Sequence, residues 1–334
     1  MGMLLHFLLV LFGVLPTIFV LIQAQDQSGF ISIDCGLPAH LNYSALDTGI
    51  SYISDAKFID TGVTKRILST EIILKHVTSG NIYLIRASFY YGNYDNLNQP
   101  PQFDLHFGAN VWDTVNFPNV SVTTTREIIY TPSLDYIQPC LVNTGSRTPF
   151  ISAIELRSLN NTAYGKYSDK SSVLSLSFRS DIGSITNLQY RYKDDVNDRI
   201  WFPFQLNEMK RLSTNEDLLG QGSYKLPAIV MSTAAIPVNA SAPLQLEWET
   251  YNVNDRFYLY MHFNEVEELA ANETREFNIT VNDKFWFGPE IPGYRSVNTI
   301  SSIRPLTGAK RYQISLYKTE NSTLPPILNA YEVY

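Results

Sequence analysis

Two clusters of acidic residues are the first candidates for catalytic chemistry in this sequence. They consist of Asp194, Asp195 and Asp198, which precede Arg199, and of Glu265, Glu267 and Glu268. A glycoside hydrolase needs two opposed carboxylates across a sugar-sized cleft, one of them with a raised pKa. Adjacent acids beside an arginine are more typical of a structural ion pair or a solvated turn. We therefore predict no catalytic residues, and a protein that is not an enzyme.

The sequence also lacks motifs for binding a metal ion or a cofactor. The histidines after the N-terminal segment are His40, His76, His106 and His262, and none stands at metal-ligand spacing. The sequence contains no His-Glu-x-x-His, no paired Cys-x-x-Cys, no Gly-x-Ser-x-Gly and no phosphate-binding glycine loop. His106 and His262 fall in expected strands, where structural roles are typical. We predict no metal site and no cofactor.

The segment best suited to hold a ligand is rich in tyrosine. It reads Tyr90-Tyr91-Gly92-Asn93-Tyr94-Asp95 and follows an expected strand, which places it on a loop at a sheet edge. Sugar rings stack on exposed aromatic faces, and a tyrosine adds a hydroxyl for polar contact. The alternative is that Tyr90 and Tyr94, which share a parity along the chain, both point inward and only stabilise the fold. The candidate ligand-binding residues are Tyr90, Tyr91, Asn93, Tyr94 and Asp95.

The first 24 residues resemble a signal peptide. Met1–Ala24 has no charged side chain, and Leu8–Ile22 is apolar apart from Gly13, Pro16 and Thr17. The run approaches the roughly 20 residues that cross a bilayer, so an uncleaved membrane anchor is the alternative. No second apolar run occurs. We expect a mature chain without a membrane span of its own.

Potential glycosylation sites agree with a secretory route. Seven Asn-x-Ser/Thr sequons occur, against about four expected by chance, at Asn42, Asn119, Asn160, Asn239, Asn272, Asn278 and Asn321. Cys35 and Cys140 are the only cysteines, and both a disulfide and two thiols remain open. The net charge of -7 without a basic cluster excludes nucleic acid as a natural partner.

An internal duplication organises the chain. Phe89 and Phe263, Phe103 and Phe277, and Trp112 and Trp286 are each separated by 174 residues. The segments Pro149–Leu156 and Pro326–Val333 match at an offset of 177. A nearly constant offset indicates two copies of one fold, so the two tryptophans should occupy equivalent strands.

Each copy reads as β structure, with period-two alternation and short runs separated by glycine, proline and asparagine. Turns spaced by roughly 8–12 residues are typical of a sandwich or barrel. Expected strands include Phe30–Asp34, Thr125–Thr131, Val173–Phe178, Leu244–Trp248 and Gln313–Lys318, with one short helical turn at Asn264–Asn272. Ser158–Asp169 lacks apolar periodicity. We place a cleavable junction there, with domains at 25–160 and 161–334 that fold around separate cores.

Several motifs resemble the malectin-like ectodomains of plant leucine-rich-repeat receptor-like kinases. They are Phe30–Pro38, Tyr83–Ala87, Tyr91–Asp95 and Pro149–Leu156 in the first half, and Asp194–Pro203, Tyr258–Phe263, Asn272–Phe277 and Asn321–Tyr334 in the second. The resemblance runs from about Phe30 to the last residue. It implies tandem malectin-type β-sandwiches, jelly-roll-like in form, an extracellular position, and perception of carbohydrate or peptide ligands.

Three departures from this family qualify the resemblance. The chain stops at Tyr334, as in a kinase-less relative that would need a receptor-like kinase partner for signalling. The stretch from Arg66 to Tyr83 is short and lacks a cysteine near Ile72; this puts the disulfide pattern in doubt and could remove a strand. Animal malectin carries paired aromatics four and five residues after the matching phenylalanine. Those positions here are Asn93 and Tyr94 in the first copy and Glu267 and Glu268 in the second.

The leading hypothesis is a non-catalytic, secreted or cell-surface binding module for a cell-wall glycan or another ligand. The alternative is a protein-interaction co-receptor or decoy ectodomain without sugar binding, which would use the crevice between the two sandwiches. If either copy binds sugar, the first is favoured, because a carboxylate offers no apolar face for a sugar ring.

Overall fold

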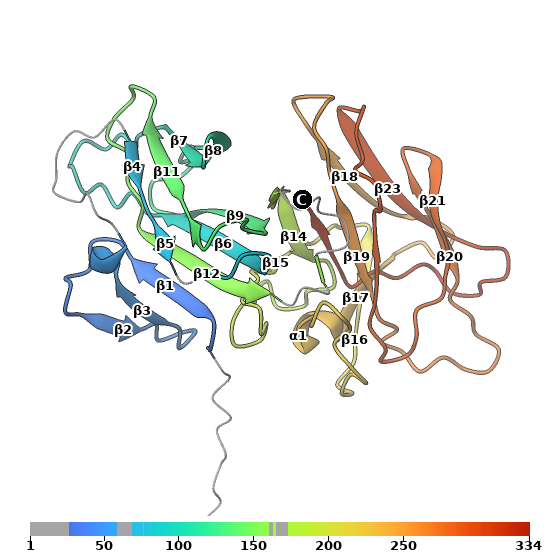
Figure 1. Cartoon of the computed structure of the whole chain (residues 1–334). Coiled ribbons are helices and arrows are strands. Elements are labelled where there is room, and N and C mark those ends of the chain that lie inside the picture. The colour runs from blue at the N-terminus through green and yellow to red at the C-terminus, as the bar shows by residue number, and fades with distance from the viewer. Residues whose placement is uncertain (1–26, 59–68, 76, 160–162, 165–172) are drawn as a thin grey trace, which may run out of the picture.

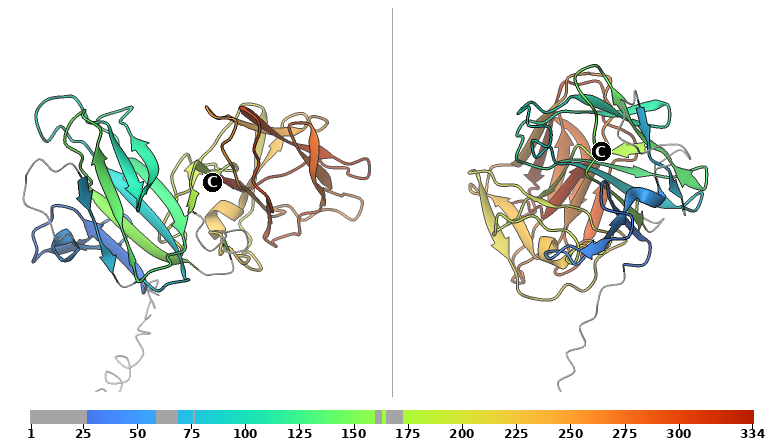
Figure 2. Two further views of the ribbon diagram at one scale, coloured as in Figure 1. Left: turned by 45° about the horizontal axis from the view of Figure 1, so that its top comes forward. Right: turned by 90° about the vertical axis from the view of Figure 1, so that its left-hand side faces the viewer.

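The protein consists of two β-sandwiches side by side, seen in a computed structural model (Figure 1). The structure describes residues 27–58, 69–75, 77–159, 163–164 and 173–334. The expected leader, His76 and the Asn160 sequon lie outside these residues, as does most of the expected junction. Two further views show the sandwiches packed against each other along one side (Figure 2). The all-β fold predicted from the sequence is confirmed.

The first sandwich is made of a seven-stranded and a four-stranded sheet. The large sheet has the order β13 (Val173–Ser175), β9 (Thr124–Tyr130), β6 (Ile82–Phe89), β12 (Ala153–Leu159), β1 (Phe30–Asp34), β3 (Ser51–Ser54) and β2 (Asn42–Ser44). The small sheet has the order β4 (Ser69–Glu71), β11 (Pro139–Asn143), β7 (Phe103–Phe107) and β8 (Asn110–Val115). β5 (Leu74–Lys75) pairs with β10 (Tyr136–Ile137), and Asp55–Lys57 forms one 3-10 turn.

The second sandwich has a five-stranded and a four-stranded sheet. The larger one has the order β15 (Phe202–Pro203), β14 (Phe178–Asp181), β24 (Ala330–Val333), β19 (Leu259–Phe263) and β22 (Asn298–Ser301). The smaller one has the order β18 (Leu244–Glu249), β23 (Arg311–Lys318), β20 (Phe277–Val281) and β21 (Lys284–Glu290). A separate pair joins β16 (Met209–Ser213) to β17 (Thr233–Pro237), and α1 (Ala228–Met231) precedes β17.

The strand orders show that the two sandwiches are copies of one topology. The order β9-β6-β12-β1-β3 corresponds to β22-β19-β24-β14-β15, and in each copy the last pair is parallel. The order β4-β11-β7-β8 corresponds to β18-β23-β20-β21. Trp112 lies in β8 and Trp286 in β21, so the predicted equivalence of the two tryptophans is confirmed.

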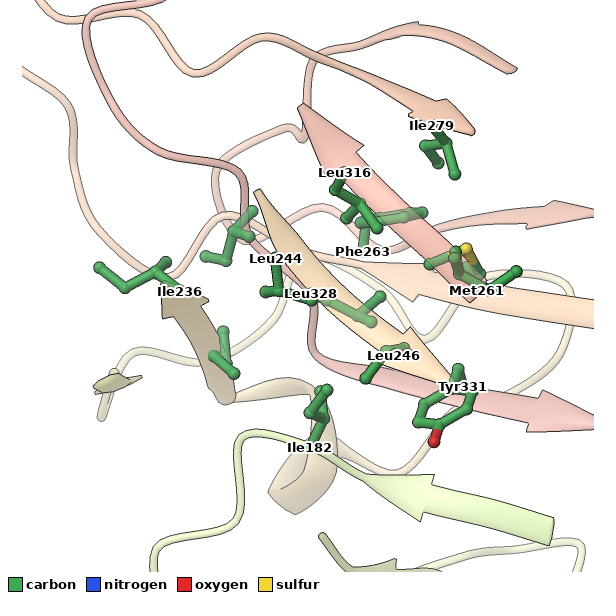
Figure 3. Packing of buried hydrophobic residues seen from close by; sticks show 14 of the residues in the cluster. Ile182, Ile236, Leu244, Leu246, Met261, Phe263, Ile279, Leu316, Leu328 and Tyr331 are labelled. Carbon is green, nitrogen blue, oxygen red and sulfur yellow. The ribbon is translucent and has the colours of Figure 1, made fainter. Parts of the chain in front are cut away.

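Alternating residues build a separate core in each sandwich. In β7 the side chains of Phe103 and Leu105 are fully buried, as are those of Phe277 and Ile279 in β20. The core of the second sandwich draws on nearly every strand of both sheets (Figure 3). Because apolar residues recur at every second position, each sheet has one face that must be covered by the other sheet.

A third core joins the two sandwiches. Leu84 and Ile129 of the first sandwich and Tyr260 and Ala330 of the second belong to one buried cluster, together with Trp201. Ala163 and Tyr164, which fall inside the expected junction, are also buried there. In addition β13, which follows the proposed boundary at residue 160, pairs with β9 of the first sandwich. The boundary itself stays a proposal.

Buried ion pairs surround this shared core. Five arginines meet five carboxylates: Arg86, Arg157, Arg179, Arg191 and Arg199 with Glu127, Glu155, Asp195, Asp198 and Glu332. Contacts cross between the sandwiches where Arg86 meets Asp198 at 3.3 Å and Arg179 meets Glu127 at 2.8 Å. The balance of charges matters, because a buried ion without a partner is strongly destabilising. A hollow of about 270 Å³ lies between the sandwiches and is lined by residues of both, among them Glu127 and Phe178.

The structure decides three further expectations from the sequence. No helix forms at Asn264–Asn272, where the structure has only a hydrogen-bonded turn from Ala270 to Glu273; the described α-helix lies at Ala228–Met231. The strand that the shortened stretch could have removed is present as β4, although it is only three residues long. Cys35 and Cys140 are half-buried thiols and are not bonded to each other. Burial, with help from Asp55 and Asp34, raises the pKa of the Cys35 thiol to about 12.

Candidate ligand-binding loop

The tyrosine-rich loop begins where β6 ends, at one end of the first sandwich. Phe89, the last residue of β6, is fully buried, and alternation then turns Tyr90 outward and Tyr91 inward. Tyr90 is 50% exposed and Tyr94 is 57% exposed, whereas Tyr91 is only 1% exposed. The interpretation in which Tyr90 and Tyr94 both point inward is therefore wrong. Anchoring the alternation at buried Phe89 would have given the correct orientation for Tyr90 and Tyr91.

Tyr91 holds the loop together from inside. Its hydroxyl donates a hydrogen bond to Asp95 Oδ1 at 2.5 Å and accepts one from the Gln99 amide at 3.3 Å. The same Asp95 oxygen accepts the Leu97 amide at 3.2 Å. The hydrogen bond from Tyr91 lowers the pKa of Asp95. Asp95 is therefore a carboxylate that already accepts a hydrogen bond from Tyr91 within the loop, although it remains half-exposed.

The turn needs residues that tolerate a left-handed backbone. Gly92, Asn93 and Asn96 all have positive φ, at 54°, 53° and 57°. Asparagine visits this region more readily than most residues, and glycine does so without strain. A Cβ at position 92 would also lie 2.9 Å from the Tyr90 ring. Asn93 closes the turn by accepting the Asn98 amide at 2.8 Å. Asn93 thus has a structural contact that any ligand would have to share.

Tyr94 lies against two other rings while staying exposed. Its ring centroid is 5.6 Å from that of Tyr91 and 5.5 Å from that of Phe150, both in edge-to-face geometry. Sequence reasoning did not identify Phe150, which reaches the loop from the segment before β12. These contacts fix the ring orientation, so little side-chain freedom remains to be lost when a ligand binds.

The matching loop of the second sandwich is held by charge instead. Glu265, two residues after Phe263 as Tyr91 is after Phe89, is 1% exposed and pairs with Arg275 at 2.5 Å. Arg275 also reaches Glu267 at 3.0 Å. The other acidic cluster is likewise paired, since Asp195 contacts Arg199 at 2.8 Å. Asp195, Asp198, Glu265 and Glu267 thus form structural ion pairs, one of the two roles expected for these clusters, whereas Asp194 and Glu268 are exposed.

The histidine in β19 is also structural. His262 is fully buried, with one ring nitrogen 3.0 Å from Thr299 Oγ1 and the other 3.1 Å from Glu332 Oε1. Burial lowers its pKa, so the neutral form is favoured. Over the described part of the chain, His, Cys, Asp and Glu side chains form no group able to hold a metal ion.

The predicted glycosylation sites are mostly accessible. Of the six sequons within the described residues, five present an exposed asparagine, namely Asn42, Asn119, Asn239, Asn272 and Asn321. Asn278, in the middle of β20, is half-buried. Asn119 and Asn239 each accept the amide of the sequon serine two residues later, at 2.9 and 3.0 Å. These side-chain oxygens are thus engaged in turns.

Family comparison agrees with this architecture. The model of the malectin-like domain matches residues 33–77 and 73–334, so its two pieces meet in the shortened stretch. The chain belongs to the malectin-like family. An Arabidopsis thaliana LRR receptor-like serine/threonine-protein kinase, At5g59680, is 41% identical over 93% of the chain, and the kinase IOS1 is 39% identical over 98%. This malectin-like chain spans only 37% and 39% of those two proteins.

Solved structures share the fold at low sequence identity. The ectodomain of ANX2 from Arabidopsis thaliana matches with a TM-score of 0.71 and 17% identity, over 91% of this chain and 96% of that one. A structure of the peptide RALF23 in complex with FER and LLG2 matches with a TM-score of 0.66 and 16% identity, over 91% and 94%. Within the described residues of the malectin-like chain, no helix has the length and apolar character to cross a membrane.

Proposed function

We propose that this malectin-like chain is a non-catalytic, glycosylated ectodomain of the cell surface or extracellular space, and that its first sandwich binds carbohydrate. The observation that carries the proposal is Tyr94, an aromatic ring more than half exposed on a loop whose shape is fixed internally. A rigid exposed ring can stack on the apolar face of a pyranose without a large entropic cost. Tyr90 and Asp95 lie beside it in the loop and would supply hydrogen-bonding groups.

The second sandwich offers no comparable surface at the matching position. Glu267 and Glu268 replace Asn93 and Tyr94, and Glu267 is already paired with Arg275. Carboxylates can accept hydrogen bonds from sugar hydroxyls, but they are strongly hydrated and have no apolar face. The proposal therefore assigns binding to one copy rather than to both.

Calorimetry with cell-wall oligosaccharides tests the proposal on the secreted chain. Tyr94→Ala should weaken binding about tenfold, which corresponds to loss of roughly 1–2 kcal/mol of stacking. Tyr251→Ala is a matched control, because Tyr251 is fully exposed in the second sandwich, far from the loop in sequence. Circular dichroism verifies that both variants fold. Equal affinity of wild type and folded Tyr94→Ala would remove the loop from the proposal.

The second candidate function is that of a protein-interaction co-receptor or decoy. The structure of FER with RALF23 and LLG2 favours it, because a protein of this fold takes part there in a peptide complex. Binding measurements with purified receptor-like kinase ectodomains separate the two functions. A complex that forms without glycan and is unchanged by Tyr94→Ala would support this second candidate over the first.

A further inference from the structure

A large hollow opens at the other end of the first sandwich. It has a volume of about 680 Å³, within the range of ordinary ligand sites. Four aromatic residues line it: Phe107, Trp112, Tyr130 and Tyr136. Tyr130 pairs with Tyr83 at the start of β6, whereas the tyrosine-rich loop follows Phe89 at its end. The hollow and the loop are therefore two different sites.

The rim of the hollow is apolar and exposed. Val111 is 60% exposed, Leu134 51% and Val173 42%, although large aliphatic side chains normally avoid water. The lining contains no charged side chain; its polar groups belong to Asn110, Gln138 and Ser175, besides the tyrosine hydroxyls and the indole N–H of Trp112. Such a surface complements an uncharged, apolar ligand, because a charged group placed there would lose water without gaining a partner.

Two sheet edges flank this hollow. β8, which contributes Asn110, Val111 and Trp112, is the last strand of the small sheet, and β13, which contributes Val173 and Ser175, is the last strand of the large one. Across the described strands, each is paired on one side only. The unpaired N–H and C=O groups of an edge strand can accept an added strand from another chain. Further along, an ion pair between Arg126 and Asp113 ties β9 to β8 and limits the opening.

We propose that this hollow binds an extended, uncharged peptide segment, which inserts an apolar side chain between β8 and β13 and bonds its backbone to one of the two edges. The aliphatic rim favours a peptide over a sugar, since sugar hydroxyls would lose water against Val111, Leu134 and Val173. A ladder of backbone hydrogen bonds gives such peptides affinity, and the pocket gives them specificity.

An adjoining hollow gives the peptide room to extend. It has a volume of about 690 Å³, and Tyr136 and Gln138 line both hollows. Lys75 and Asp135 line the second one, so charged side chains line the adjoining hollow but not the first. The site thus accommodates an apolar anchor residue in the first hollow and polar residues further along the same segment.

Selection from a phage-displayed library of random 12-residue peptides tests the proposal on the full secreted chain. Enriched peptides should carry uncharged segments with apolar residues at alternate positions. A synthetic copy of the strongest peptide, titrated by fluorescence polarisation, should bind the double variant Leu134→Asp/Val173→Asp at least tenfold more weakly. Ile303→Asp is the matched control, because Ile303 is 76% exposed in the second sandwich and lines neither hollow.

Hydrogen exchange provides the second measurement. Bound peptide should slow amide exchange in β8 or β13 and leave β21, the counterpart of β8, unchanged. The proposal fails if no peptide is enriched, or if the double variant binds the peptide as wild type does. It also fails if the wild-type chain binds neutral oligosaccharides on an array and the folded double variant loses that binding but keeps its binding to peptides. The Tyr94→Ala variant should bind the peptide normally, so this test is independent of the carbohydrate proposal.

Discussion

Glu155→Gln is the sharpest test of how the two sandwiches are joined. Glu155 is 2% exposed and accepts hydrogen bonds from Tyr52 at 2.6 Å, Arg157 at 2.8 Å and Arg86 at 2.9 Å, with Arg191 also at 2.8 Å. Glutamine keeps the shape of the side chain but removes its charge. The guanidinium groups of Arg86, Arg157 and Arg191 would then lose one negatively charged partner. The N–H₂ group of the new glutamine is a donor only, so it could not accept hydrogen bonds from the donors that face it.

The size of the effect follows from the pKa. Burial alone would raise the pKa of Glu155, but Arg86, Arg157 and Arg191 outweigh it and lower the pKa from 4.5 to about 2. A carboxyl group whose pKa is lowered on folding stabilises the protein at pH values above the unfolded-state pKa. This stabilisation is lost as the pH falls toward the folded-state pKa. A difference of about 2.5 units corresponds to about 3 kcal/mol at pH 7. The difference in the free energy of unfolding between wild type and Glu155→Gln should fall to about half of its pH 7 value near pH 3.

Urea unfolding followed by tryptophan fluorescence measures this difference. Trp201 reports on the shared core directly, since it is fully buried there and its indole N–H donates to Asp195 at 2.7 Å. Glu247→Gln is the control; Glu247 pairs with Arg311 on the surface, and both side chains are more than half exposed. The control should lose less than about 1 kcal/mol. A loss below about 1 kcal/mol for Glu155→Gln at pH 7, or a loss that does not shrink on acidification, refutes the reasoning.

Other predictions concern single groups. Burial raises the pKa of Asp181 to about 7, so wild type should lose stability as pH rises from about 4 to 7. Asp181→Asn should abolish this dependence and stabilise the protein at pH 7 by up to about 4 kcal/mol; chemical denaturation at both pH values checks this, and equal slopes would contradict it. Tyr91→Phe removes the hydrogen bond to Asp95 and should accelerate amide exchange at Leu97 without unfolding the sandwich; unchanged exchange would show that the bond does not order the loop. Secreted protein should migrate above 37.9 kDa and return toward that mass after N-glycosidase treatment, and an unshifted band would exclude glycosylation.

The sequence alone determined most of the strand pattern and the duplication, although the expected strand Val173–Phe178 is divided between β13 of the first sandwich and β14 of the second. Alternating apolar residues such as Phe103, Leu105 and their counterparts Phe277 and Ile279 predict strands because side chains in a strand point to opposite faces in turn. A constant offset between matched residues then requires that equivalent strands recur in equivalent places. The first signal is local in the sequence, the second compares two distant segments of it, and neither depends on how the copies meet.

The sequence also identified the loop after Phe89, but only the structure decided that Tyr94 faces water. The left-handed backbone of Gly92 and Asn93 ends the strand alternation, so parity cannot place Tyr94. Its position depends on Phe150, which lies 56 residues further along the chain and contacts it at 5.5 Å. Contacts between distant segments leave no periodic trace in a single sequence.

The joint between the sandwiches and the peptide-sized hollow belong to the tertiary structure alone. Arg86, in β6 of the first sandwich, and Asp198, in the loop before β15 of the second, are 112 residues apart and meet only because the two sandwiches pack together. Read singly, such residues look like ordinary surface charges, since burial is a property of the assembled fold. The hollow likewise forms between β8 and β13, two edges from different sheets whose relative position is set by the core beneath them.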